Sequence, residues 1–386
     1  MSKIIELRGI AWDHPRGCAP LRATSKEFSK IQSNVIISWD VRSLKEFGDM
    51  PIEDLIDQYD LITIDHPYMG QAYENKLLLP IENWLSEETL SELAGQSVGA
   101  SFLSYCFKNH QYALPIDAAA QVAVSRTDLV KKLNLALPKT REELMAFYKI
   151  VPNEFSIAWP LCTTDLWCSF LTLCAQDNGR DFIQNNSIET KTGSNVLDEL
   201  KRHLEYLHPE SINWNPINVL DRMGSDDRII YSPYLFGYTN YSRVGFTKNI
   251  LSFSNSPINP DNIVSTILGG VGLAISTKCK HAMQAVEYVK YIASSKTQKG
   301  PYTKNEGQPG NLVAWKSKNN NILCNNFFKN TITTMENAYV RPQHSGWNQF
   351  QEKGADLLHE GIIKDIPSDK LMKKLNELYK SILNDE

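Results

Sequence analysis

Residues 110–134, HQYALPIDAAAQVAVSRTDLVKKLN, decide the fold, because they hold a long extended apolar run in the middle of the chain. YALPIDAAAQVAVSR, residues 112–126, is typical of a pair of extended segments. A second extended apolar run, GGVGLAIS, lies at residues 269–276. The chain has 386 residues, more than one hydrophobic core usually serves, so we expect two lobes.

The first third of the chain alternates strand and helix patterns. Apolar, β-branched runs predict strands at IIELRGIAW (4–12), NVIISWDV (34–41) and DLITID (60–65). Helical spacing of apolar residues lies between them, in APLRATSKEFSKI (19–31) and MPIEDLIDQY (50–59). This βαβαβ order predicts an α/β fold with a doubly wound, mainly parallel sheet flanked by helices.

Composition excludes several classes of protein. The formal net charge is −4, and no strong basic tract indicates nucleic-acid binding. No apolar stretch is long enough to predict a membrane span. Seven scattered cysteines lack the spacing of a disulfide framework or a zinc site, and the N-terminus MSKIIELRGIAW lacks a signal-peptide pattern. The cysteine usage and the missing signal pattern predict a cytoplasmic protein, or a periplasmic or extracellular one if a signal has been removed. We also expect a monomer.

Four stretches give the chain a resemblance to a known family. They are DLITID with the following LLLPIENWL, the 110–134 stretch, LGGVGLAISTKCKHAMQAVEYVKYIASSKTQ (268–298) and EGQPGNLVAW (306–315). Together they resemble the extracellular solute-binding proteins of family 1, the maltose-binding-like proteins of ABC transporters. The resemblance implies a periplasmic-binding-protein-like fold, with lobe 1 at 1–116 plus 272–315 and lobe 2 at 117–271 plus 316–386. Residues 111–125 and 265–276, both extended apolar runs that resemble the family's hinges, are expected to cross between the lobes. It also implies a small-molecule ligand in an interlobe cleft, a permease partner if the protein is secreted, and no cofactor.

The tripeptide Asp-His-Pro occurs twice, each time after a predicted strand. In a 2-1-3 strand order these strands are neighbours, so Asp13, His14, Asp65 and His66 are expected to meet on the cleft floor. Asp117 is expected to face the same cleft from the side. We interpret the cluster as a ligand contact, with turn capping and a divalent metal as the alternatives. A cytoplasmic enzyme using the same four residues as acid–base or metal-ligand groups is the alternative function.

Aromatic and basic residues near predicted strand ends and loops complete the candidate site. Flat rings with a polar edge suit stacking on sugar rings, and guanidinium groups suit a carboxylate or phosphate. The proposed ligand is therefore polar, a sugar-like molecule or a carboxylated metabolite. The ligand-binding candidates beyond the Asp-His-Pro cluster are Trp12, Arg16, Tyr68, Tyr234, Arg341, His344 and Trp347, and Trp159, Trp167, Tyr231 and Tyr238 also lie near strand ends or loops.

Cys162 is the one candidate nucleophile. It precedes a predicted helix in WPLCTTDLW, where the free N–H groups of a helix start would lower the pKa of the thiol. The alternative is an inert buried cysteine. Signatures of other catalytic classes, such as a GxSxG turn or a P-loop, do not occur in the sequence. The sequence therefore favours binding over catalysis.

Overall fold

A computed structural model describes residues 3–226 and 228–384 of the chain. The strands are β1 (Ile5–Trp12), β2 (Val35–Arg42), β3 (Leu61–Ile64), β4 (Cys106–Phe107), β5 (His110–Gln111), β6 (Ala113–Ser125), β7 (Ser156–Ile157), β8 (Ile183–Gln184), β9 (Ser187–Ile188), β10 (Ile229–Phe236), β11 (Ser252–Ser254) and β12 (Leu268–Ile275). The helices up to residue 225 are α1 (Pro15–Ile31), α2 (Leu44–Asp49), α3 (Glu53–Ile56), α4 (Met69–Glu74), α5 (Glu87–Gly95), α6 (Thr127–Lys132), α7 (Arg141–Tyr148), α8 (Thr163–Asn178), α9 (Thr190–Leu204) and α10 (Pro216–Ser225). The later helices are α11 (Ala282–Ala293), α12 (Ser295–Thr297), α13 (Leu312–Trp315), α14 (Lys318–Leu323), α15 (Phe327–Glu336), α16 (Trp347–Ile363) and α17 (Ser368–Asn384).

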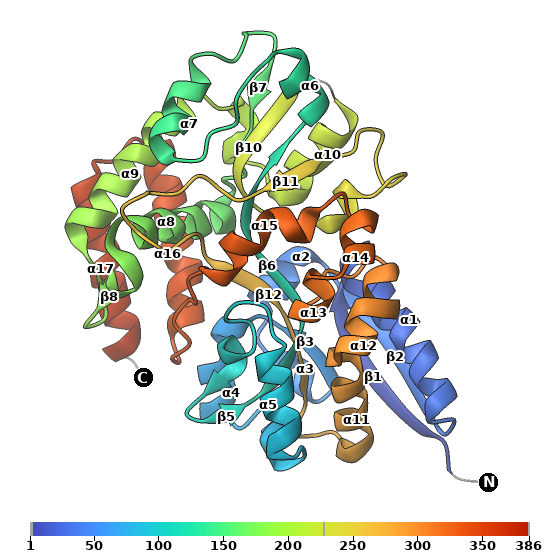
Figure 1. Cartoon of the computed structure of the whole chain (residues 1–386). Helices are drawn as coiled ribbons and strands as arrows, with labels where there is room; N and C mark the ends of the chain where they lie inside the picture. The colour runs from blue at the N-terminus through green and yellow to red at the C-terminus, as the bar shows by residue number, and fades with distance from the viewer. Residues whose placement is uncertain (1–2, 227, 385–386) are drawn as a thin grey trace.

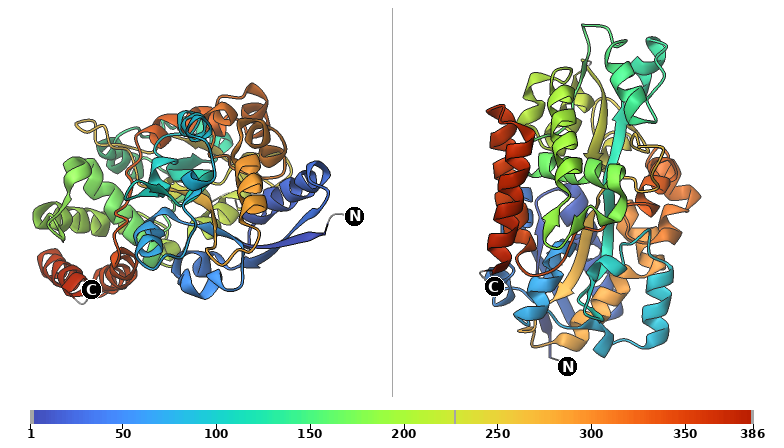
Figure 2. Two further views of the ribbon diagram at one scale, coloured as in Figure 1. Left: turned by 90° about the horizontal axis from the view of Figure 1, so that it is seen from below. Right: turned by 90° about the vertical axis from the view of Figure 1, so that its left-hand side faces the viewer.

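Strand β6 joins the two halves of the molecule. All 13 of its residues are buried, and it forms one continuous strand where the sequence predicted a pair of segments. Residues 113–120 pair with β12, whereas residues 121–125 pair with β10 and β11. Figure 1 shows β6 and β12 running from the lower half of the molecule into the upper half, and the right-hand view of Figure 2 shows β6 along its length. The continuous strand order is β2-β1-β3-β12-β6-β10-β7.

The sheet is mixed, where the sequence predicted a mainly parallel one. The order β2-β1-β3 is parallel, as expected from the βαβαβ pattern. Beyond it, β12 is antiparallel to both β3 and β6, and β10 is antiparallel to β6. The reason is the route of the chain: β6 leads out of the first half and β12 leads back into it, so the two run in opposite directions.

A bulge interrupts the ladder between β6 and β12, close to the middle of the molecule. Val271 pairs with Asp117 but the next residue, Gly272, pairs with Pro115, so Ile116 is the extra residue. Proline lacks an N–H donor and is tolerated in a strand at such a site. Gly270 has φ +117°, and a Cβ there would lie 2.5 Å from the carbonyl oxygen of Asp117. Only glycine therefore permits this close approach of the two strands.

Each half has its own buried apolar cluster. In the first half, α1 and α11 cover the sheet, with Phe28 and Tyr288 in contact with residues of β1 and β2 such as Leu7. In the other half, α8 is buried on nearly every side; α9 and α16 pack against it, and α17 packs against those two helices (Figure 1). Among the described residues no helix is both long enough and apolar enough to cross a bilayer.

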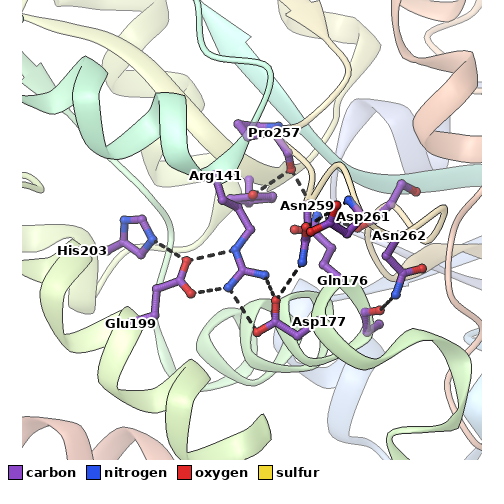
Figure 3. Close-up of polar contacts among 12 residues, drawn as sticks. Arg141, Gln176, Asp177, Glu199, His203, Pro257, Asn259, Asp261 and Asn262 are labelled. Carbon is purple, nitrogen blue, oxygen red and sulfur yellow. Dashed lines mark hydrogen bonds and ion pairs between the residues drawn. The ribbon is translucent and has the colours of Figure 1, made fainter.

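A polar cluster joins three helices of the second half (Figure 3), and its His203 is fully buried against the core residues Tyr148 and Trp159. Arg141, the first residue of α7, forms ion pairs with Asp177 of α8 and Glu199 of α9. His203 Nε2 lies 3.2 Å from Glu199 Oε1, and Asn259 donates a hydrogen bond to Asp177. Burial opposes the ionisation of Glu199, but His203 and Arg141 outweigh it and lower its pKa to about 2. The cluster has a structural role.

Candidate functional site

A cavity of about 440 Å³ lies where β6 and β12 pass between the two halves. Its floor is formed by residues of the two crossing strands, Ala119, Gly269, Gly270 and Val271. The side toward β1 and β3 contributes Trp12, Arg16, Phe47, Asp65 and Tyr68. The opposite side contributes Cys162, Thr163, Thr164, Asp165, Tyr238 and Arg341. Both halves of the molecule therefore wall one cavity.

A second cavity of about 460 Å³ adjoins the first. The two share lining residues, among them Tyr68, Thr163, Thr164 and Asn348, so they form one continuous cleft. The second chamber is more polar, and its further lining includes Gln71, Asn75, Ser345, Gln349, Glu352 and Asp356. The first chamber thus offers several aromatic side chains, and the second offers amides and carboxylates beside Tyr68 and Trp167.

Arg16 is a buried residue of the first Asp-His-Pro segment and lines the cleft. Its Nε and Nη2 donate to the carboxylate of Asp117 at 2.8 and 2.5 Å, and its Nη1 donates to the carbonyl of Gly237 at 2.9 Å. The guanidinium lies 4.5 Å from the centre of the Tyr238 ring. The β-bulge at Ile116 sets the direction of Asp117, so the crossing strand positions this ion pair.

His14 starts α1 and does not reach the cavity wall. Its Nδ1 accepts a hydrogen bond from the Arg16 backbone N–H at 3.0 Å, which makes it the N-cap of the helix. Its ring meets the Tyr238 ring edge-on at 4.9 Å. Burial, with the positive charge of Arg16, lowers the pKa of His14 to about 4. The imidazole is therefore neutral at physiological pH.

Asp65 and His66 hold the segment that precedes α16. Arg341 Nη2 donates to Asp65 Oδ2 at 2.6 Å, and the Arg341 backbone N–H donates to His66 Nε2 at 3.3 Å. His66 Nε2 is thus the acceptor, so its proton sits on Nδ1, 3.1 Å from Asp65 Oδ1. Burial opposes the ionisation of Asp65, but Arg341 and His66 outweigh it and hold its pKa well below the usual range.

Further contacts extend this docking. Gln343 donates to the carbonyl of His66, Asn348 donates to that of Pro67, and the Gly70 backbone N–H donates to the Gln343 carbonyl. The second Asp-His-Pro motif therefore fixes residues 341–348 against the end of β3.

The expected cluster of Asp13, His14, Asp65 and His66 is not assembled. β1 and β3 are neighbours, as predicted, but Asp13 is exposed, and its carboxylate has no hydrogen bond or ion pair with the described residues. His14 and His66 are engaged in the separate contacts above. Within the described ranges no group of three or more His, Cys, Asp or Glu side chains is arranged to hold a metal ion. The two Asp-His-Pro motifs thus have different roles, although they follow adjacent strands. His14 caps α1, whereas Asp65 and His66 bind Arg341.

Five other sequence candidates do not line the cleft. Asp117 and His66 lie behind the cleft wall. Asp117 forms an ion pair with Arg16, and His66 accepts a hydrogen bond from the Arg341 backbone. Tyr234 is fully buried, donates to the Pro257 carbonyl at 2.7 Å and packs against Trp159. His344 contacts the Tyr379 hydroxyl at 2.8 Å, and Trp347 is buried among Trp167, Phe350 and Tyr379. Trp12, Arg16, Asp65, Tyr68 and Arg341 do line the cleft, together with Tyr238.

Cys162 lines the cleft but lacks the properties of a nucleophile. It is the residue that caps α8, as expected, yet its pKa is raised, not lowered. Burial is the main cause, and the neighbouring Asp165 carboxyl acts in the same direction. The Sγ donates to Asp165 Oδ2 at 3.1 Å. Desolvation therefore outweighs the effect of the helix start, and the thiol stays protonated at neutral pH.

Several lining residues were missed from the sequence. Thr163, Thr164 and Asp165 form the first turn of α8, and Asn215 caps α10. Their residue types indicate helix starts, which is a detectable signal. That both starts point into one cleft depends on how the two helices pack, and no local pattern carries that information. No pattern in the sequence indicated that Phe47 and Lys45 of the short helix α2 line the cleft.

An α/β molecule in two halves, with crossing strands beneath a cleft, is the architecture of a two-lobed binding protein. Residues 54–317 match the family described as bacterial extracellular solute-binding protein. This is more than half of the chain, and the chain belongs to that family.

Relatives of known structure share the fold over the whole chain. A maltose-bound MalE3 of T. maritima superposes with a TM-score of 0.83 at 14% identity, covering 98% of this chain and 99% of that one. A solute-binding protein of Agrobacterium radiobacter K84 in complex with ribitol gives 0.82 at 16% identity, with the same coverage of both chains. A maltotriose-binding protein of Pyrococcus abyssi is 26% identical over 102 residues, which are 26% of this chain and 22% of that relative's length.

Proposed function

We propose that the cleft binds a sugar-like polar small molecule. The observation that carries this proposal is the cleft wall itself: Trp12, Phe47 and Tyr238 offer aromatic side chains beside hydroxyl, amide and charged groups. Sugars present apolar ring faces and polar rims, so such a wall complements them. The printed ligands of structural neighbours, namely maltose, ribitol, α-D-tagatose and D-mannitol, support the same class.

The two halves are proposed to act as lobes, at 1–116 with 272–315 and at 117–271 with 316–386. On this division, Arg16 of the first Asp-His-Pro segment donates a hydrogen bond to Gly237 of the other lobe. Asp65 of the second segment accepts one from Arg341 of the other lobe. Arg16, Asp65 and Arg341 all line the cleft, so a ligand bound there would add its own contacts with both lobes. A ligand that binds the closed form more tightly shifts the equilibrium toward closure.

An ABC-transporter permease is the proposed partner, in keeping with a family described as extracellular. Seven free cysteines predict the cytoplasm instead. Fractionation of cells that express the protein from its own gene distinguishes the two. Recovery outside the cytoplasmic membrane supports the permease, whereas recovery with the cytoplasmic enzymes contradicts it.

A ligand panel tests the binding proposal. Thermal unfolding is followed with millimolar maltose, tagatose, ribitol, mannitol and sorbitol, for the wild type, Trp12→Ala and Trp84→Ala. Trp84 is 44% exposed and does not line the cleft, so it is the matched control. A stabilising ligand raises the melting temperature through mass action. We expect at least one panel member to stabilise the wild type and Trp84→Ala but not Trp12→Ala. Equal stabilisation of all three proteins would contradict the site.

A further inference from the structure

Among the described residues, Asp165 is the one buried carboxyl group on the cleft wall that has no basic partner. It lies in the first turn of α8 and is 6% exposed. It lines the first cavity, called the aromatic chamber below because Trp12, Phe47, Phe236 and Tyr238 also line it. The only hydrogen bond to its carboxylate within the described part of the chain comes from the Cys162 thiol. Asp65 and Asp117, in contrast, each pair with a buried arginine. A buried carboxylate without a cation is costly, so this position calls for an explanation.

The groups that face this carboxyl do not compensate it. Cys162, the N-cap of α8, and Cys168 within α8 contribute thiols, and the segment after β10 contributes the Tyr238 phenol. The cationic groups of the chamber are Arg16 and Arg341, which are held by Asp117 and Asp65, and Lys45, which is exposed on α2. Burial raises the pKa of Asp165 to about 7, opposed by the Cys162 hydrogen bond.

The same chamber holds the aromatic rings. Trp12, Phe47, Phe236 and Tyr238 line it together with Asp165. Aromatic faces and a carboxylate are the two features that proteins combine to recognise an organic ammonium group. A neutral hydroxyl can also hydrogen-bond to Asp165, but it leaves the buried charge without a counter-charge.

We propose that Asp165 receives a protonated amine of the ligand, and that the solute is an amino-bearing polyol, such as an amino sugar or an amino alditol. This inference rests on the proposed function, because it assigns the ligand class of the same cleft. The amine stabilises the ionised form of Asp165, so its binding displaces the proton that the empty cleft holds there at neutral pH. Affinity for a strongly basic amine therefore rises between pH 6 and 8.

Matched probe pairs test the inference. 1-Amino-1-deoxy-D-sorbitol and D-sorbitol differ only in an ammonium group for a hydroxyl, and D-glucosamine and D-glucose form a second pair. Calorimetric titrations at pH 6, 7 and 8 use the wild type, Asp165→Asn and Asp356→Asn. Asp356 is an exposed carboxylate on the wall of the second chamber, so its variant controls for a general loss of negative charge.

We expect the wild type and Asp356→Asn to bind at least one amine tenfold or more tightly than its neutral twin at pH 8. In Asp165→Asn, checked for folding by circular dichroism, the preference falls below twofold and the pH dependence is lost. A neutral twin that binds the wild type as tightly as its amine, or a preference that survives in Asp165→Asn, overturns the inference. Binding of neutral sugars alone leaves the proposed function standing, whereas a panel in which nothing binds overturns both.

Discussion

Arg16 and Asp117 lie 101 residues apart in the sequence and form a two-pronged ion pair on the cleft wall, with both side chains almost completely buried. Arg16 opens α1 and Asp117 sits at the bulge of β6, so the pair joins the first helix to the crossing strand. It orients Arg16 over the Tyr238 ring and thereby shapes the aromatic chamber.

Removing one partner of this pair should destabilise the protein strongly. Asp117→Asn leaves a buried guanidinium without its counter-charge, which costs about 3–5 kcal/mol of unfolding free energy. Urea denaturation measures the loss. The control is Asp40→Asn, which breaks the exposed pair between Asp40 and Arg8 and should change stability little. A similar small effect for Asp117→Asn would refute the structural role.

The two Asp-His-Pro motifs should respond unequally to mutation. Asp65→Asn loses the ion pair with Arg341 and should cost about 3 kcal/mol, because the arginine stays buried. Asp13→Asn alters an exposed carboxylate and should leave stability nearly unchanged. Hydrogen exchange should show faster opening of residues 341–348 in Asp65→Asn only. Equal effects of the two substitutions would restore the symmetric cluster expected from the sequence.

Stability should depend on pH through His14. Its folded pKa, about 4, lies below the ordinary 6.5, so the unfolded chain binds more protons between these values. Stability therefore rises with pH across this window, by on the order of 3 kcal/mol from this group. His14→Asn keeps a side-chain N-cap acceptor but cannot titrate. Its stability should vary less between pH 4 and 6.5 than that of the wild type, as measured by denaturation at each pH. Identical profiles would contradict this assignment.

Asp165 should produce a dependence of the opposite sign. Its folded pKa, about 7, lies above the ordinary 3.8, so the folded state holds the extra proton between these values. Its contribution to stability is complete below pH 3.8 and is lost as the pH rises through 7. Relative to the wild type, Asp165→Asn should therefore lose less stability between pH 4 and 7. Parallel profiles for the two proteins would show that the carboxyl is ionised throughout this range and would contradict the raised pKa.

Cys162 should react slowly with iodoacetamide at neutral pH, because its pKa is raised and the thiolate is the reactive form. Peptide mass spectrometry compares its labelling rate in the folded protein with that in urea, where the same cysteine is the control. Faster labelling in the folded state would revive the thiol-enzyme interpretation.

Local patterns were sufficient for much of the fold. The strands β1 to β3 depend on neighbouring residues, and each was predicted from its apolar, β-branched run. Strand β6 was wrongly predicted as two segments. Its continuity past Pro115 depends on a bulge formed with β12, about 150 residues further along the chain, which no local pattern reveals. The site was less predictable. Tyr234 and Trp347 adjoin polar residues in sequence, but sequence does not tell which way a ring points, and both are core residues.

The central claim is that the aromatic chamber beneath Trp12 binds a sugar-like solute. Isothermal titration calorimetry tests it most directly, with the panel member that stabilises the wild type as the titrant. Arg141→Lys is the control, because Arg141 forms ion pairs with Asp177 and Glu199 away from the cleft (Figure 3). Trp12→Ala and Tyr238→Ala should each weaken binding tenfold or more, about 1.4 kcal/mol, whereas Arg141→Lys should lower the melting temperature and leave the affinity unchanged. Unaltered affinity in both aromatic variants would contradict the account.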